Sequence, residues 1–160
     1  MLETLSQLIA AWAALFGSHA VLRTAVDFAH IGGLVTGGGC AIAADRATLM
    51  AARQAPEVRS AQLSSLRQTH RIVLIALAFV AASGVLLFAS DVDTFLPSRM
   101  FWLKLGLVAL LLANGAWLLR LETRAQKGGD GAWTALRCAT IASLSLWLLT
   151  TLAGVALTNI

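Results

Sequence analysis

Four long apolar stretches constrain the fold of this chain more than any other feature. They cover residues 28–44, 72–90, 100–119 and 138–157, and each holds 17 to 20 residues. A helix rises about 1.5 Å per residue, so each stretch would be about 26 to 30 Å long, close to the thickness of the hydrocarbon core of a bilayer. Only 12% of the 160 residues are charged, whereas a soluble domain has about 25%. The sequence therefore predicts a membrane protein.

The connections between these stretches indicate how the helices are arranged. Neighbouring helices joined by connections this short must run antiparallel. We therefore predict an all-α fold, a transmembrane up-down four-helix bundle that forms a single domain over residues 1–160. Its spans are expected at about 25–45, 71–90, 100–120 and 138–158.

Basic residues predict the orientation of the bundle. The segment 45–71 holds five arginines and the segment 120–137 holds three arginines and a lysine, whereas 91–99 holds one arginine and two aspartates. The positive-inside rule then puts the first two connections in the cytoplasm, and both termini outside. The net charge of +4 follows from this bias. No cluster of basic and aromatic residues indicates a nucleic-acid partner.

The segment 2–16 is too short to span a bilayer. Its large apolar residues recur at helical spacing, with polar residues on the opposite side. This pattern predicts an amphipathic helix that lies on the external surface of the membrane. A cleaved signal peptide is the competing interpretation, but the segment lacks the basic start typical of one.

The candidate chemistry begins on the first span. His19, Arg23, Asp27 and His30 are separated by 4, 4 and 3 residues, which puts them on one stripe of a single helix. His30 lies just inside the apolar stretch. A neutral imidazole ligates haem iron, binds copper or relays protons. The structural alternative is a histidine that is hydrogen-bonded to a neighbouring helix.

Glycines follow His30 in the same stretch. Gly33 and Gly37 form a GxxxG pattern in a run that holds three further glycines. Small residues at this spacing let two helices approach closely. A second interpretation is that a glycine face beside a histidine lets a flat cofactor ring lie against the backbone. His30 is therefore a candidate metal ligand, and Gly33 and Gly37 are candidate cofactor-binding residues.

Lys104 lies one turn into the third span, at about the depth of His30. Its side chain can extend to the headgroups, or it can turn inward and pair with Asp27, which needs a cationic partner at this depth. Arg23, one turn away on the same stripe, competes for that role. Asp27 and Lys104 are thus candidate catalytic residues, and Met100 is a candidate second ligand on depth alone.

The other two histidines are too far from His30 to ligate the same iron within one chain. His19 lies 11 residues before His30, which is about 16 Å along a helix. His70 stands at the cytoplasmic start of the second span, about a bilayer core away from His30. We expect His70 to lie at the membrane interface.

Three motifs carry a resemblance to known proteins. The chain reads FAHIGG at 28–33, LRQTHRI at 66–72 and FWLKL at 101–105. Over residues 20–125 it resembles the small bacterial membrane proteins around HemJ-type protoporphyrinogen oxidases and CopD-type copper proteins, together with related four-helix families. In the HemJ type, a first-span histidine is associated with haem b and a third-span lysine is functionally important. The resemblance implies those roles for His30 and Lys104.

These observations lead to one functional expectation and two alternatives. We expect a multi-pass protein of the bacterial inner membrane that binds haem b and acts in redox chemistry, either alone or as a small subunit of a membrane electron-transfer complex. Its partners would be the lipid bilayer, and other membrane subunits or further copies of the chain. The alternatives are a non-enzymatic structural or assembly subunit, and a permease for copper or a small molecule.

Overall fold

The computed structural model describes residues 2–128, 131–157 and 159, and within them the protein is all α-helical. The helices are α1 (Leu2–Ser18), α2 (Ala20–Ala51), α3 (Pro56–Ser90), α4 (Val92–Phe95), α5 (Arg99–Gln126) and α6 (Ala132–Leu157). The predicted fold class is thereby confirmed. Each predicted span lies within one of the four long helices, except that Thr158, the predicted end of the fourth, lies outside the described residues.

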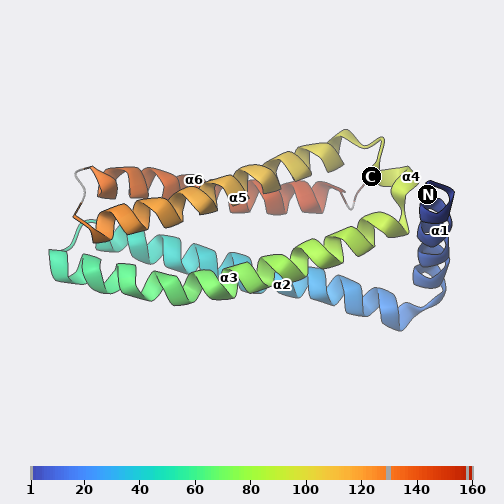
Figure 1. Ribbon diagram of the computed structural model, residues 1–160, viewed down its shortest axis with the longest axis horizontal. Coiled ribbons are helices and arrows are strands. Elements are labelled where there is room, and N and C mark those ends of the chain that lie inside the picture. The colour runs from blue at the N-terminus through green and yellow to red at the C-terminus, as the bar shows by residue number, and fades with distance from the viewer. Residues whose placement is uncertain (1, 129–130, 158, 160) are drawn as a thin grey trace.

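The bundle consists of two antiparallel pairs, α2 with α3 and α5 with α6, which lie along each other (Figure 1). The contact between the pairs runs mainly through α2 and α6. We call the end where α2 meets α3 and α5 meets α6 the loop end. The opposite end, where α1 and α4 lie, is called the α1 end, and both chain termini are found there (Figure 1).

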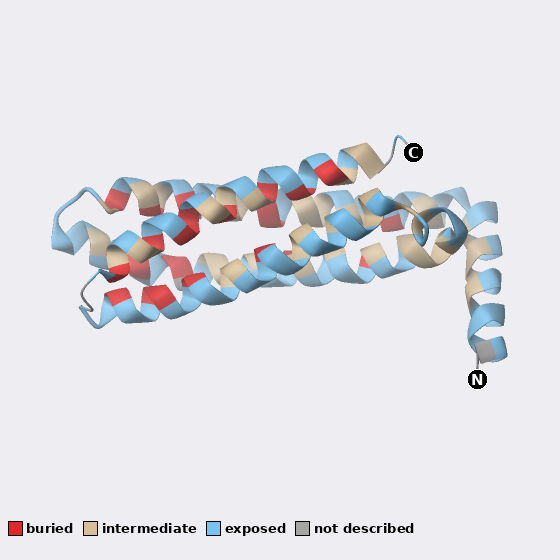
Figure 2. Cartoon of the chain, turned by 90° about the horizontal axis from the view of Figure 1, so that it is seen from above, coloured by how far each residue is buried: buried red, intermediate tan, exposed pale blue. Residues whose placement is uncertain are grey.

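The four long helices have the length and composition needed to cross a membrane. Their outer surfaces carry large apolar side chains, such as Phe28 (75% exposed), Leu148 (66%) and Trp117 (58%). Exposed residues dominate the outside of the bundle along its whole length (Figure 2). An apolar surface of this extent is stable in lipid and unfavourable in water, so the chain is a multi-pass membrane protein.

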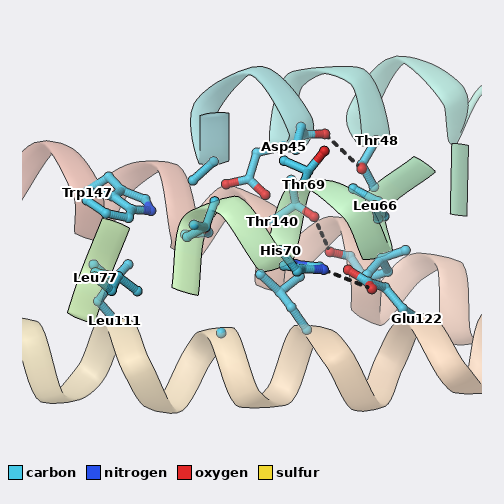
Figure 3. Close-up of a pocket in the computed structure, with 17 residues that line it drawn as sticks. Asp45, Thr48, Leu66, Thr69, His70, Leu77, Leu111, Glu122, Thr140 and Trp147 are labelled. Atoms are coloured by element: carbon cyan, nitrogen blue, oxygen red, sulfur yellow. Dashed lines mark hydrogen bonds and ion pairs between the residues drawn. The ribbon is translucent and has the colours of Figure 1, made fainter. Parts of the chain in front are cut away.

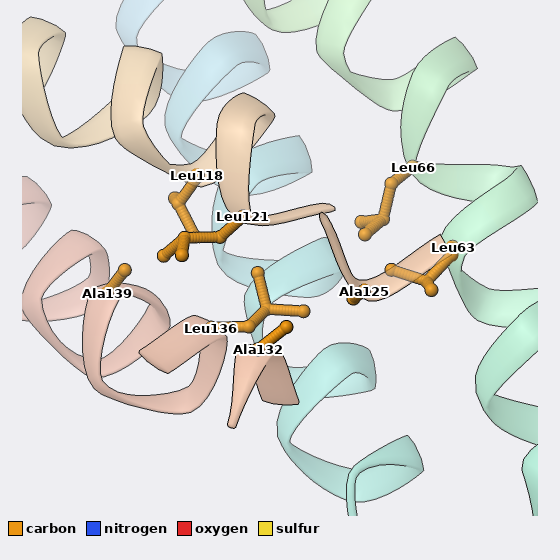
Figure 4. Close-up of a cluster of buried hydrophobic side chains, with 8 residues drawn as sticks. All are labelled: Leu63, Leu66, Leu118, Leu121, Ala125, Ala132, Leu136 and Ala139. Carbon is orange, nitrogen blue, oxygen red and sulfur yellow. The ribbon is translucent and has the colours of Figure 1, made fainter. Parts of the chain in front are cut away.

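The helices continue beyond the apolar stretches at the loop end. α2 has 32 residues and α3 has 35, so they are about 48 and 52 Å long and exceed a bilayer core of about 30 Å. Inside this end lies a cluster of small and branched apolar side chains, namely Leu63, Leu66, Leu118, Leu121, Ala125, Ala132, Leu136 and Ala139 (Figure 4). This cluster joins α3, α5 and α6 near their loop ends, and Ala44 of α2 packs against it.

The helix α1 lies across the end of the bundle (Figures 1 and 2). The indole Nε1 of Trp12 donates a hydrogen bond to the carbonyl of Leu86 at 2.8 Å. The guanidinium of Arg23 donates to the carbonyls of Phe16 and Gly17 at the carboxyl end of α1. These bonds tie α1 to α2 and α3. A helix that lies across the ends of the spans has the direction expected of an interfacial helix.

The glycines of α2 allow close contacts with two other helices. A Cβ atom built at Gly33 would lie 2.7 Å from Cγ2 of Val80, and one at Gly37 would lie 3.0 Å from Cβ of Ala76. Both partners belong to α3. A Cβ at Gly38 would lie 3.3 Å from Cε3 of Trp147, which is on α6. These glycines therefore bring α3 and a tryptophan ring against the backbone of α2.

Candidate functional site

His30 faces α3 within the bundle. Its Nδ1 lies 3.0 Å from Oγ of Ser83, and a Cβ at Gly84 would lie 3.4 Å from Cε1 of the ring. The imidazole therefore rests on a serine and a glycine of α3. This is the bond to a neighbouring helix that the structural interpretation of His30 anticipated.

The partners of Ser83 decide which nitrogen of His30 carries the proton. The single hydroxyl proton of Ser83 is donated to its own helix, with Oγ at 2.6 Å from the carbonyl of Phe79. Its oxygen can then only accept from His30, so Nδ1 carries a hydrogen. With this assignment, the lone pair of the neutral ring resides on Nε2, which is then the nitrogen that can bind a metal or a proton.

Lys104 reaches across the bundle to α6. A Cβ at Gly154 would lie 3.6 Å from Nζ and 3.7 Å from Cε of the lysine, so the end of the side chain lies against Gly154. Its ammonium group is also an electrostatic neighbour of the His30 ring. The inward orientation considered for Lys104 is thus the one observed. His30 and Lys104 are brought to the same part of the bundle from different helices.

Asp27 is a second electrostatic neighbour of the His30 ring, whereas Met100 is near this group only by its position on α5. Asp27 is exposed, and within the described part of the chain it forms no ion pair with Lys104 or Arg23. Arg23 instead binds the end of α1. Met100 is half-buried in the first turn of α5, one turn before Lys104. The pairing of Asp27 with either cation, considered from the sequence, is therefore not formed.

The face of α2 with Gly33 and Gly37 is already filled. α3 packs on both glycines, and the ring that lies against the backbone of α2 at Gly38 is the indole of Trp147. The sequence pattern was consistent with a helix contact or with a flat ring. The structure shows a helix contact, together with a ring that belongs to the protein itself.

His70 belongs to a second group, at the loop end. It lies 40 residues from His30 in the sequence, and its Nδ1 is 3.5 Å from Oε2 of Glu122 on α5. Its side chain is 24% exposed, so it is turned partly toward the other helices of the bundle. We call Asp45, His70 and Glu122 the loop-end site. Figure 3 shows the three side chains directed toward a common space between the helices.

The loop-end site surrounds a cavity of about 70 Å³. Besides the three titratable side chains, its lining includes the hydroxyl groups of Thr48, Thr69, Thr140 and Ser143. Asp45 and Glu122 are 8% and 7% exposed. Each of the four long helices contributes at least one polar group to this cavity.

Asp45 and Glu122 were not recognised in the sequence, although it held a signal for each. Glu122 lies 18 residues, or five helical turns, after Lys104, and so falls on the same face of α5. Asp45 lies 7 residues after Gly38, which puts it on the face of α2 that packs inward. Both residues were read instead as parts of polar connections because they stand at the edges of the apolar stretches.

The two sites lie at different depths. His30 and Asp45 are separated by 15 residues of one helix, or about 22 Å. Buried residues of α6 run between these depths at steps of 3, 4 and 3, namely Thr140, Ser143, Trp147 and Thr150. Within the described residues, no group of three or more His, Cys, Asp or Glu side chains is placed to hold a metal ion.

Comparisons of the chain with protein-family models, with curated proteins and with solved structures give no match. The functional argument therefore depends on the geometry of the two sites.

Proposed function

We propose that this chain is a haem-b-binding redox protein of the bacterial inner membrane, or a small subunit of a membrane electron-transfer complex there. The observation that carries the proposal is the hydrogen bond from Nδ1 of His30 to Ser83. A histidine that ligates a metal typically donates its other ring N–H to a fixed acceptor, which sets the tautomer and the ring orientation. His30 meets this requirement.

The surroundings of His30 fit a haem group in two further respects. The half-buried His30 ring belongs to the apolar stretch of α2, so an iron porphyrin bound there would be shielded from water. Lys104 supplies a positive charge near the same depth, which suits a propionate. Haem, when bound, would supply one-electron transfer. His30 would hold the iron through Nε2, and Met100 is the candidate second ligand.

We also propose that the loop end faces the cytoplasm and the α1 end faces outward. The support is the distribution of exposed basic side chains, since Arg46, Arg53, Arg71, Arg120, Arg124 and Arg137 are all exposed at the loop-end half of their helices. Positive charge in cytoplasmic connections is the usual determinant of orientation. The crosswise helix α1 would then lie on the external surface.

The absorbance spectrum of the detergent-purified protein tests the haem proposal. We expect a Soret band, with α and β bands on reduction, in protein expressed with haem available or reconstituted with it. His30→Ala should remove or strongly shift the Soret band while the protein still inserts in the membrane. His70→Ala is the matched control, and it should leave the band in place because His70 lies at the other end of the bundle. A colourless protein that cannot be reconstituted would refute the proposal.

A non-enzymatic structural or assembly subunit is the second candidate function. The observation that favours it is the use of Gly33 and Gly37 for contact with α3, since small residues in spans commonly serve packing alone. In that case His30 is a structural residue that links α2 to α3 through Ser83. Copurification of the colourless protein with another membrane protein, from cells that express both at natural levels, would support this function.

A further inference from the structure

The loop-end site combines a cavity with enclosed acidic and basic side chains. The cavity of about 70 Å³ has room for several water molecules, because one water needs about 10 to 15 Å³ measured in this way. Two carboxyl groups, one imidazole and several hydroxyls line it (Figure 3). Polar groups of this kind are the partners that buried water requires. The site therefore has the composition of a hydrated pocket inside the bundle.

Asp45 has an oxygen atom without a partner. Its Oδ2 is buried and accepts no hydrogen bond from any described residue, and the residue lines the cavity. The other side of the carboxyl group has the hydroxyl of Ser143 as a hydrogen-bond partner. Since the residue is 8% exposed, bulk water does not satisfy the free oxygen. A water molecule of the cavity, or a proton on the carboxyl group, would lower the cost of burying it.

Among the side chains that the structure describes, which do not include that of Arg67, the charges that face the site do not balance. α2 contributes Asp45 and α5 contributes Glu122, while α3 contributes His70, which lies 3.5 Å from Glu122. α6 contributes only hydroxyl groups to the lining. Among the described residues, no lysine or arginine forms an ion pair with either carboxyl group. Two ionised carboxylates beside one imidazole would leave unpaired negative charge in a medium of low dielectric constant, which is strongly unfavourable.

We propose that Asp45, Glu122 and His70 form a proton-exchange site that is separate from the candidate haem site. A hydronium ion that enters the cavity gives a proton to a carboxylate oxygen, leaving a neutral carboxylic acid and a water molecule. The reverse step returns the proton to the water. The carboxyl groups of Asp45 and Glu122 accept and release the proton, and the imidazole of His70, 3.5 Å from Glu122, can exchange it with that carboxyl group. Carboxyl and histidine groups inside spans serve as proton relays in this manner.

The site is placed for exchange with the loop-end side of the membrane. The titratable groups stand near the loop end of α2, α3 and α5, about 22 Å along α2 from His30. The proposal rests on the cavity and its lining, and it holds whether or not His30 binds haem. A failure of the haem experiment therefore leaves it intact.

Infrared difference spectroscopy of the purified wild-type protein tests this proposal without any substitution. We expect the carbonyl stretching band of a protonated, poorly solvated carboxylic acid at neutral pH. The band should shift to lower frequency when the buffer is changed to D₂O, because the acid proton exchanges through cavity water. Absence of such a band at neutral pH, or a band that D₂O does not shift, would overturn the proposal.

Carboxyl-to-amide variants assign the band to residues. Asp45→Asn and Glu122→Gln should each remove part of it, and the double variant should remove it, with the helix content followed by circular dichroism. Asp27→Asn is the matched control, since it changes an exposed aspartate of the same helix as Asp45, and it should leave the band unchanged. A band that survives the double variant would contradict the assignment.

A sodium titration distinguishes the proton from the other small cation that carboxylate and hydroxyl oxygens bind. For a proton-exchange site, replacing potassium chloride with sodium chloride at constant pH should leave the band unchanged. Loss of the band with sodium, and its return with potassium, would overturn the proposal in favour of a sodium site.

Discussion

The α1 end and the loop end of this bundle place polar groups inside apolar helices in opposite ways. At the α1 end, the Nδ1 of His30 has a defined partner in Ser83, and the ammonium of Lys104 lies against Gly154. At the loop end, the carboxyl groups of Asp45 and Glu122 are more deeply buried, and one oxygen has no partner within the described chain. The hydrogen bond of His30 sets the orientation of its ring, whereas the buried carboxyl oxygen still needs a hydrogen-bond partner.

The difference has a physical origin in how each end is sealed. α1 lies across one end of the bundle but leaves much of the helix surface near it exposed (Figure 2). The loop end is closed by an apolar cluster to which α3, α5 and α6 all contribute (Figure 4). Polar groups just inside that cluster have little contact with bulk water, since lipid and protein surround them. A hydrated cavity is the arrangement that reconciles their burial with their polarity.

The largest expected effect concerns the sides of the membrane on which the two ends lie. In a background without Cys40 and Cys138, Thr94→Cys in the exposed helix α4 should react with an impermeant thiol reagent in intact cells. Gln54→Cys, in the exposed connection at the loop end, should react only after the membrane is permeabilised. The opposite labelling pattern would show that the loop end faces outward.

A packing change between the ends should have the next largest effect. Gly37→Leu would force a side chain into a site where a Cβ alone lies 3.0 Å from Ala76, and overpacking of this kind costs about 1 to 3 kcal/mol. Gly39→Leu is the matched control, because nothing lies within 4 Å of a Cβ at Gly39. Thermal unfolding in detergent should show a lower midpoint for the first variant alone. Equal midpoints would mean that α2 and α3 do not pack closely at Gly37.

The smallest expected effect tests the hydrogen bond that orients His30. Ser83→Ala removes the acceptor for Nδ1 and should lower stability by about 1 kcal/mol. Ser145→Ala is a suitable control, since Ser145 is exposed and bonds only within its own helix. Thermal unfolding measures both variants under the same conditions. If Ser83→Ala behaves like the control, the α1 end does not depend on a fixed histidine, and the contrast with the loop end is lost.

Predictions from the sequence were correct where they depended only on residues of a single helix. The periodicity over residues 2–16 predicted the helix α1, and the apolar stretches predicted the four long helices. The depth of His30 and Lys104 on their own helices also predicted that both would lie in the same half of the bundle. The pairing of Asp27 with Lys104 or Arg23 is not formed. A pair with Lys104 depends on how α5 is rotated about its axis, and Arg23 binds the end of α1 instead.

The sequence by itself determined that this protein has four apolar helices in an all-α fold, because apolar length and helical period are properties of contiguous residues. Only the tertiary structure decided that Trp147 covers Gly38 and that His70 meets Glu122. These contacts join helices that are far apart in sequence, and they depend on how each helix is rotated about its axis. The loop-end site arises from that rotation, because residues that look like the polar ends of separate spans are turned toward one cavity.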